Sequence, residues 1–276
     1  MTGSISHKVL TCLSNVGFIP TSVCMLKIFC LLAVPFLSCT AFVLVLDHFY
    51  LSVSTNFANE IMNVVSDLTF ALTGILCPLV NYSLHKRFPD TLPHQELKPP
   101  RRIILLLVTF AINFGTLLTY MITESYKIVD KKADKWQISL TMTIIGPVAM
   151  IYTQISLFSY LYLFGCIVTI YQAKTVEATG TCCVNVSEFI AYHKQVLMNY
   201  KLFKKSVSPG LFIIFTLQTI SAILMVYVTI KISSGPFEIF VSSFCWSSGV
   251  CLILIYTALV SDDVEQSRQE WIDHLM

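Results

Sequence analysis

Long apolar segments separated by short polar ones dominate the pattern of this chain. Six of them, at about 1.5 Å per residue, are long enough as helices to cross the ~30 Å apolar layer of a bilayer. They cover residues 24–46, 61–84, 103–123, 138–160, 211–230 and 237–260. No segment alternates apolar and polar residues with a period of two, so strands are not expected. The pattern predicts an all-α, polytopic membrane protein with six transmembrane helices in a single domain, residues 1–276.

Two helical segments are expected to lie outside the bilayer. The fourth apolar segment continues to about Tyr171, too long for one crossing and too short for two, so we expect that helix to protrude. Before the fifth segment, residues 188–205 predict an amphipathic cytosolic helix, because apolar and aromatic side chains recur there at three- and four-residue steps. They are Phe189, His193, Val196, Leu197, Tyr200 and Phe203. Periodicity leaves two arrangements open: a helix on the membrane surface, or one packed against its equivalents in other subunits.

The distribution of basic residues predicts the orientation. Cytosolic segments are usually rich in Lys and Arg. If the N-terminus is cytosolic, 13 of the 18 basic residues lie inside, and the five outside are Lys127, Lys131, Lys132, Lys135 and Lys231. The glycosylation sequons at Asn81 and Asn185 are then cytosolic, and we expect neither to carry a glycan.

Composition narrows the function classes. Hydrophobic residues make up 55% of the chain and charged residues 12%, about half the share usual in soluble domains. The net charge of +2 indicates no nucleic-acid partner. No enzyme motif or pair of neighbouring intramembrane carboxylates is present, and all six histidines fall outside the apolar segments. We therefore expect no enzyme, no cofactor and no metal centre.

Several familiar membrane classes also lack their signatures here. A G-protein-coupled receptor usually shows Asp/Glu-Arg-Tyr after its third span, Asn-Pro-x-x-Tyr in its seventh and an outer disulfide. A voltage-gated channel carries arginine at every third position of one span, and a potassium channel has a TVGYG filter. None of these occurs in the sequence. A divergent G-protein-coupled receptor and a small transporter or accessory membrane protein stay open as alternatives.

Polar side chains inside the apolar segments suggest a ligand site. Asp67 is the one acid in the interior of a segment, since Glu238 lies at the very start of the last one. An intramembrane acid is by default a functional candidate. In the predicted topology, five polar or amphipathic residues lie in the outer half or the middle of their segments. They are Asp67, Thr116, Tyr120, Gln218 and Trp246. Polar groups from several helices at one depth would line a small-molecule pocket open to the outside. The alternative is that they only join helices through hydrogen bonds.

Three stretches resemble the insect gustatory receptor family, relatives of the insect odorant receptors. They are "NVGFIPTS" at residues 15–22, "YHKQVLMNYKLFKKSVSPGLFIIFTLQTISAILMVY" running into the fifth segment, and "FCWSSGVC" with the polar stretch "SDDVEQS" that follows it. The order and spacing of the segments and the long fourth helix are similar as well.

The resemblance implies a ligand-gated cation channel of the plasma membrane that responds to a tastant. Such proteins assemble as tetramers, as homomers or with other receptor subunits, mainly through cytosolic helices near the membrane. Each subunit binds a small molecule in an outward-facing pocket. The family has a seventh span that lines the pore, and this chain ends where that span is expected to begin. The last stretch is expected to be a cytosolic helix with Ser261 as its N-cap.

Overall fold

The structure, a computed structural model, describes residues 2–46, 57–87, 100–130, 136–180, 186–232 and 237–275. These residues form seven helices, and no strand occurs among them: α1 Thr2–Asn15, α2 Val23–Leu46, α3 Phe57–Arg87, α4 Ile103–Asp130, α5 Trp136–Gly180, α6 Val186–Ile232 and α7 Phe237–Leu275. The expected all-α fold is confirmed for this part of the chain.

Five of the helices contain a segment long and apolar enough to cross a membrane. These segments are Val23–Phe42, Val64–Lys86, Ile145–Ala173, Phe203–Tyr227 and Phe244–Asp273. The chain is thus a multi-pass membrane protein by the length and composition of its helices. The remaining expected segment, 103–123, falls in α4, whose apolar stretch is shorter, Ile103–Thr119.

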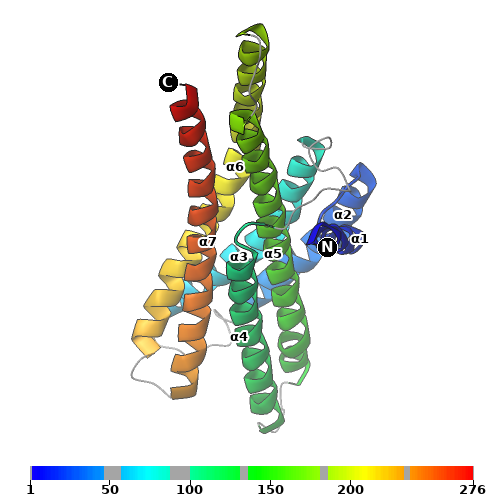
Figure 1. Cartoon of the computed structure of the whole chain (residues 1–276). Coiled ribbons are helices and arrows are strands. Elements are labelled where there is room, and N and C mark those ends of the chain that lie inside the picture. The colour runs from blue at the N-terminus through cyan, green and yellow to red at the C-terminus, as the bar shows by residue number, and fades with distance from the viewer. Residues whose placement is uncertain are drawn as a thin grey trace.

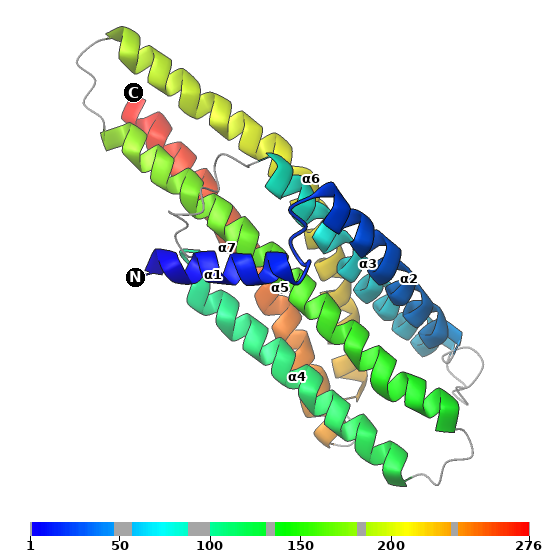
Figure 2. The same ribbon diagram turned by 90° about the vertical axis from the view of Figure 1, so that its right-hand side faces the viewer.

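Helices α2 to α7 run alongside one another and alternate in direction, whereas α1 lies across them (Figures 1 and 2). Helix α5 occupies the middle of this bundle and contacts α2, α3, α4, α6 and α7. Its apolar segment is 78% buried, against 17–39% for the other four. The core is therefore built around α5, with Tyr160, Phe164 and Cys166 among its most buried side chains.

The sequence did not predict α1, and a glycine explains how this helix ends. Gly17 has a φ of +88°, a backbone conformation that glycine adopts without strain. The N–H of Phe18 donates to the carbonyl of Leu13 (2.9 Å), and the N–H of Gly17 to that of Ser14 (2.9 Å). This pair of bonds is the Schellman motif that closes many helices.

The turn after α1 contacts α3 through a hydrogen bond and α5 through an aromatic pair. The amide nitrogen of Asn81 donates to the Phe18 carbonyl at 3.1 Å, and the Phe18 ring lies 5.1 Å from that of Tyr152. Asn81 is 0% exposed, so its sequon is closed off by packing in this structure. The stretch "NVGFIPTS" therefore connects α1 to α2 and packs against the bundle through Phe18.

Helices α5, α6 and α7 are longer than a bilayer crossing, with 45, 47 and 39 residues. The expected continuation of the fourth apolar segment beyond residue 160 is confirmed, because α5 runs unbroken to Gly180. The amphipathic residues 188–205 are the first part of α6 rather than a separate element. The expected N-cap at Ser261 is wrong: α7 runs unbroken through this position, and the Ser261 hydroxyl donates to the carbonyl of Thr257, one turn earlier.

Helices α4 and α7 approach closely at Gly249. A Cβ atom at this position would lie 2.6 Å from Oδ1 of Asn113 and 2.7 Å from its Cγ. Small residues let transmembrane helices pack at short range in this way. Gly115 on α4 provides a contrast, because a Cβ there would meet nothing within 4 Å.

Replacing Gly249 by Val should therefore separate α4 from α7. Overpacking of this kind costs roughly 1–3 kcal/mol, so we expect a lower midpoint of thermal unfolding for the purified protein in detergent. Gly115→Val is the matched control, because it adds the same side chain to a helix at an open position. Equal midpoints for the two variants would show that the α4–α7 contact at Gly249 is not as close as described.

Candidate functional site

Four of the five predicted site residues have described side chains, and they fall into two groups. Asp67, Gln218 and Trp246 lie around α3, whereas Thr116 lies on α4, which packs against α5 and α7. Tyr120 belongs to α4, but its side chain is outside the described ones.

Two residues of the first group, Trp246 and Gln218, each contact α3 from another helix. Phe70, one turn after Asp67, has its ring 5.9 Å from that of Trp246 on α7. One turn further along α3, the Thr73 hydroxyl accepts a long hydrogen bond of 3.5 Å from Nε2 of the buried Gln218 on α6. Phe70 and Thr73 therefore place the contacts of Trp246 and Gln218 within one turn of α3.

Thr116 has a different environment. It is 6% exposed, and its hydroxyl donates to the carbonyl of Ile112 in its own helix at 2.8 Å. Asn113, one turn before it, faces Gly249 of α7 and keeps a buried Oδ1 without a hydrogen-bond partner among the described residues. An interhelical acceptor at this point is available to a ligand or a water molecule.

Most intramembrane hydroxyls resemble Thr116 in bonding within their own helix. Each of the following donates to the carbonyl four residues earlier: Thr40, Thr69, Thr73, Thr109, Ser156, Ser159 and Thr257. This arrangement satisfies a hydroxyl donor in lipid without an interhelical bond. The oxygens of these hydroxyls therefore keep lone pairs for other partners, as the Thr73 oxygen does for Gln218.

Two cavities open beside α3. The smaller, about 20 Å³, has room for one or two water-sized occupants. It is lined by Leu37, Thr40, Ala41, Asp67, Phe70, Ala71, Gly146, Ala149, Met150 and Thr153. The larger, about 400 Å³, is an open groove between α2 and α3 with an almost wholly apolar lining. Asp67 lines the smaller cavity, and neither is lined by Thr116, Gln218 or Trp246.

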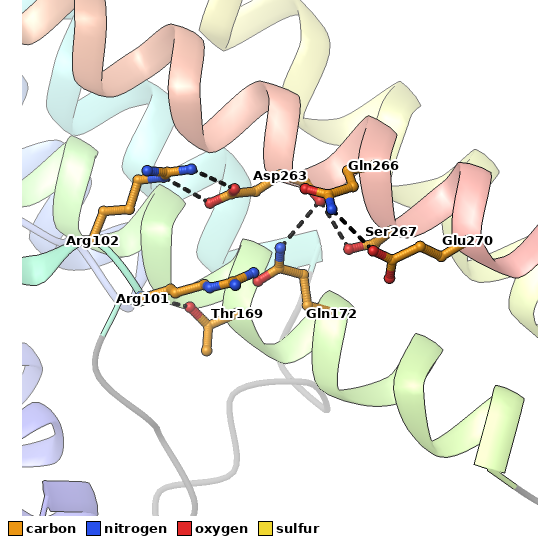
Figure 3. A network of polar contacts seen from close by, with 8 residues as sticks. All are labelled: Arg101, Arg102, Thr169, Gln172, Asp263, Gln266, Ser267 and Glu270. Carbon is orange, nitrogen blue, oxygen red and sulfur yellow. Dashed lines mark hydrogen bonds and ion pairs between the residues drawn. The ribbon is translucent and has the colours of Figure 1, made fainter.

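A second polar cluster, which the sequence did not predict, joins the turn before α4 to α5 and α7 at the other end of the bundle (Figure 3). The Arg102 guanidinium, just before α4, binds the Asp263 carboxylate of α7 through two hydrogen bonds of 2.8 and 3.0 Å. Nε2 of Gln172 on α5 donates to the Asp263 carbonyl at 3.1 Å. The backbone N–H of Arg101 donates to the Thr169 hydroxyl of α5 at 3.2 Å.

The two charged partners of this cluster differ in how far they are exposed to solvent. The Asp263 side chain is 5% exposed and that of Arg102 is 34% exposed, so the buried carboxylate depends on its partner. Hydrogen bonding to Asp263 raises the pKa of the Arg102 guanidinium, and desolvation opposes this shift. Arg102 therefore remains a cation throughout the physiological range.

Residues 188–205, the first part of α6 and from here on the α6 extension, contact α5 and α7 at this end of the bundle through aromatic side chains. The indole N–H of Trp271 donates to Nδ1 of His193 at 2.8 Å. The Tyr171 ring lies 5.2 Å from that of Phe203, and the Arg268 guanidinium is 5.5 Å from the centre of the Tyr200 ring. Of the apolar face predicted for residues 188–205, His193, Tyr200 and Phe203 thus contact α5 or α7 of the same chain, whereas Leu197 is exposed. The side chains of Phe189 and Val196 lie outside the described ones.

Comparisons with protein-family models, curated proteins and solved structures find no match for this chain.

Exchanging Arg102 for Met tests the cluster in Figure 3. This change leaves the buried Asp263 carboxylate without its bidentate partner, and we expect a loss of roughly 2 kcal/mol of stability, measured as a lower unfolding midpoint. Arg101→Met removes the same charge from the neighbouring position, where the described contact to Thr169 uses the backbone N–H and the residue is exposed. We expect that control to unfold close to the wild-type midpoint. A similar drop in both variants would mean that charge alone, and not the ion pair, matters.

Proposed function

We propose that this chain is a chemosensory receptor subunit of the plasma membrane that binds a small-molecule tastant. The chain crosses the bilayer six times, with α4 as one of the crossings, and its N-terminus is cytosolic. The subunit works as a ligand-gated cation channel in a tetramer, formed with copies of itself or with other receptor subunits. This proposal rests on the resemblance to insect gustatory receptors and on the placement of polar residues.

The observation that carries the proposal is the meeting of Trp246 and Gln218 on α3. Both reach the same short stretch of that helix, through Phe70 and Thr73. A ligand between these side chains would touch α3, α6 and α7 together. Trp and Gln suit such a position, because one offers a large apolar face and the other both a donor and an acceptor.

The geometry also offers a route from that site to the opposite end of the protein. Helix α7 is unbroken between Trp246 and Asp263, a distance of ~26 Å at 1.5 Å per residue. A displacement of α7 by a ligand would therefore act on the Arg102–Asp263 pair and on the Trp271–His193 contact. In a tetramer joined near these helices, such a shift would alter the contacts between subunits.

Positive charge supports the orientation. The exposed side chains on the α6 extension include Lys194, Lys201, Lys204 and Lys205, and basic residues are enriched on the cytosolic side of membrane proteins. The end of the bundle with the Arg102–Asp263 pair is then cytosolic, and Asp67, near the start of α3, is toward the outside.

Substitutions at Trp246 and Gln218 test the ligand site. Cells that express the chain, alone or with partner subunits, are screened for currents evoked by a panel of sugars, bitter compounds and organic acids. For an active compound, Trp246→Ala and Gln218→Leu should each raise the half-maximal concentration about tenfold, which corresponds to a loss of ~1.4 kcal/mol. Surface expression should not change.

Phe244→Ala is the matched control, since Phe244 is an aromatic residue on the same helix that is 56% exposed. We expect its dose–response curve to match that of the wild type. Unchanged curves for Trp246→Ala and Gln218→Leu would contradict the site. A complete lack of evoked current at the cell surface would favour a transporter or accessory protein.

A further inference from the structure

Exposed basic side chains from four parts of the chain lie at one end of the apolar segments. They are Lys27 on α2, Lys86 on α3, Arg101 just before α4 and Lys204 on α6. Lys86 is the last residue of its apolar segment, and Lys204 follows the first residue of another. The apolar stretch Ile103–Thr119 begins two residues after Arg101. We call these four residues the basic belt.

Contacts between α3 and α6 place Lys86 and Lys204 at the same height along the bundle. The two helices run in opposite directions (Figures 1 and 2), and Gly210 of α6 packs on Val80 of α3. Lys86 lies six residues after Val80, and Lys204 lies six residues before Gly210. Each lysine is therefore ~9 Å from this contact in the same direction.

Lys27 on α2 lies close to this height. A Cβ atom at Gly74 of α3 would be 3.1 Å from Cδ1 of Leu37 on α2, and the two helices run in opposite directions. Lys27 lies ten residues before Leu37, and Lys86 lies twelve residues after Gly74. The corresponding distances along the bundle, ~15 and ~18 Å, differ by less than one helical turn.

Arg101 reaches the same height through its contact with α5. Gly165 of α5 packs on the proline before Arg101. Helix α5 runs parallel to α3, and its Thr153 packs on Gly74 of α3. Gly165 lies twelve residues after Thr153, as Lys86 does after Gly74. The belt therefore surrounds the bundle from α2 through α3 to α6 and the start of α4.

Positive charge is in excess at this height. Within the described ranges, no ion pair is found for Lys27, Lys86 or Lys204. The acids of the described residues at this height lie on α7, where Asp263 is ion-paired and Asp262 is exposed. The four cations of the belt therefore outnumber the one exposed acid beside them.

A bilayer supplies the matching negative charge. The belt lies where the apolar segments end, which is the level of the phospholipid headgroups. A lysine near an anionic lipid surface strengthens association by about fivefold. Its flexible stem lies along apolar surface while the ammonium group, with three hydrogen-bond donors, reaches the headgroup oxygens.

We propose that the basic belt binds the headgroups of anionic phospholipids in the leaflet at this end of the bundle. The ammonium groups of Lys27, Lys86 and Lys204 contact headgroup phosphates, so that lipid connects α2, α3 and α6 around the outside of the protein. The orientation proposed above makes this leaflet the cytosolic one. The belt is separate from the proposed tastant site, and its lipid binding does not depend on ligand-evoked current.

The test measures the lipid selectivity of the full chain. Purified protein is reconstituted in phosphatidylcholine vesicles with a trace of spin-labelled phosphatidylserine or spin-labelled phosphatidylcholine, and the fraction of label immobilised at the protein is measured. At low salt the wild type should associate about threefold more strongly with phosphatidylserine. The preference should vanish in 1 M salt, where the Debye length is ~3 Å. Both leaflets contain the label, so the orientation does not affect the result.

Variants locate the preference on the belt. The double variant Lys86→Gln with Lys204→Gln should lose most of it, whereas Lys86→Arg with Lys204→Arg keeps both charges and should retain it. Lys194→Gln is the matched control for Lys204→Gln. Lys194 is exposed on the same helix, ten residues or ~15 Å further from the apolar segment, and its removal should leave the preference unchanged.

Three results would overturn the proposal. They are equal association of the wild type with both lipids, full preference in the double Gln variant, and equal losses in Lys194→Gln and Lys204→Gln. Inorganic phosphate, added at constant ionic strength, should not release the spin-labelled phosphatidylserine. Release would show a site for free phosphate in place of a lipid surface, and would also contradict the proposal. If the Gln variants do not fold, the salt series on the wild type decides the question.

Discussion

Within a lipid bilayer each helix satisfies its own backbone hydrogen bonds, so side-chain packing decides where the helices lie. In this protein that packing converges on α5, which the other long helices surround. Tyr160, Tyr162 and Phe164 on α5 are almost fully enclosed, and aromatic side chains of this size fix the spacing of their neighbours. The positions of α3, α4, α6 and α7 follow from covering this one helix, and so do the places where their polar residues meet.

The polar groups separate into two regions along the bundle. In one, Asp67, Thr73, Gln218 and Trp246 face the space around the first half of α3. In the other, Arg102, Gln172 and Asp263 hold together the ends of the long helices. The apolar middle of α7 connects the two regions without a break in its helix. A movement begun in either region therefore has a direct path to the other, and this is the mechanical basis of the proposed receptor function.

Hydrophobic length was enough to predict the helices, because a run of about twenty apolar residues in this composition has few alternatives. The exceptions depended on tertiary contacts. Helix α1 ends at Gly17 in a motif that needs the three-dimensional turn, and Ser261 has a good capping side chain but lies where α7 continues. The Arg102–Asp263 pair joins residues 161 positions apart, and no local pattern indicates such a partner. Asp67 stood out in sequence as an intramembrane acid, whereas its cavity with Thr40 and Thr153 required the packing of three helices.

The proposed topology is tested most directly by the location of the two chain ends. Short epitope tags at the N- and C-termini are stained in intact cells and after permeabilisation, with a surface protein of known orientation as the reference. Six crossings from a cytosolic start predict that both tags bind antibody only in permeabilised cells. Staining of one tag in intact cells would mean an odd number of crossings, and staining of both would reverse the orientation. Either result would contradict an outward-facing ligand site with cytosolic α5–α7 ends.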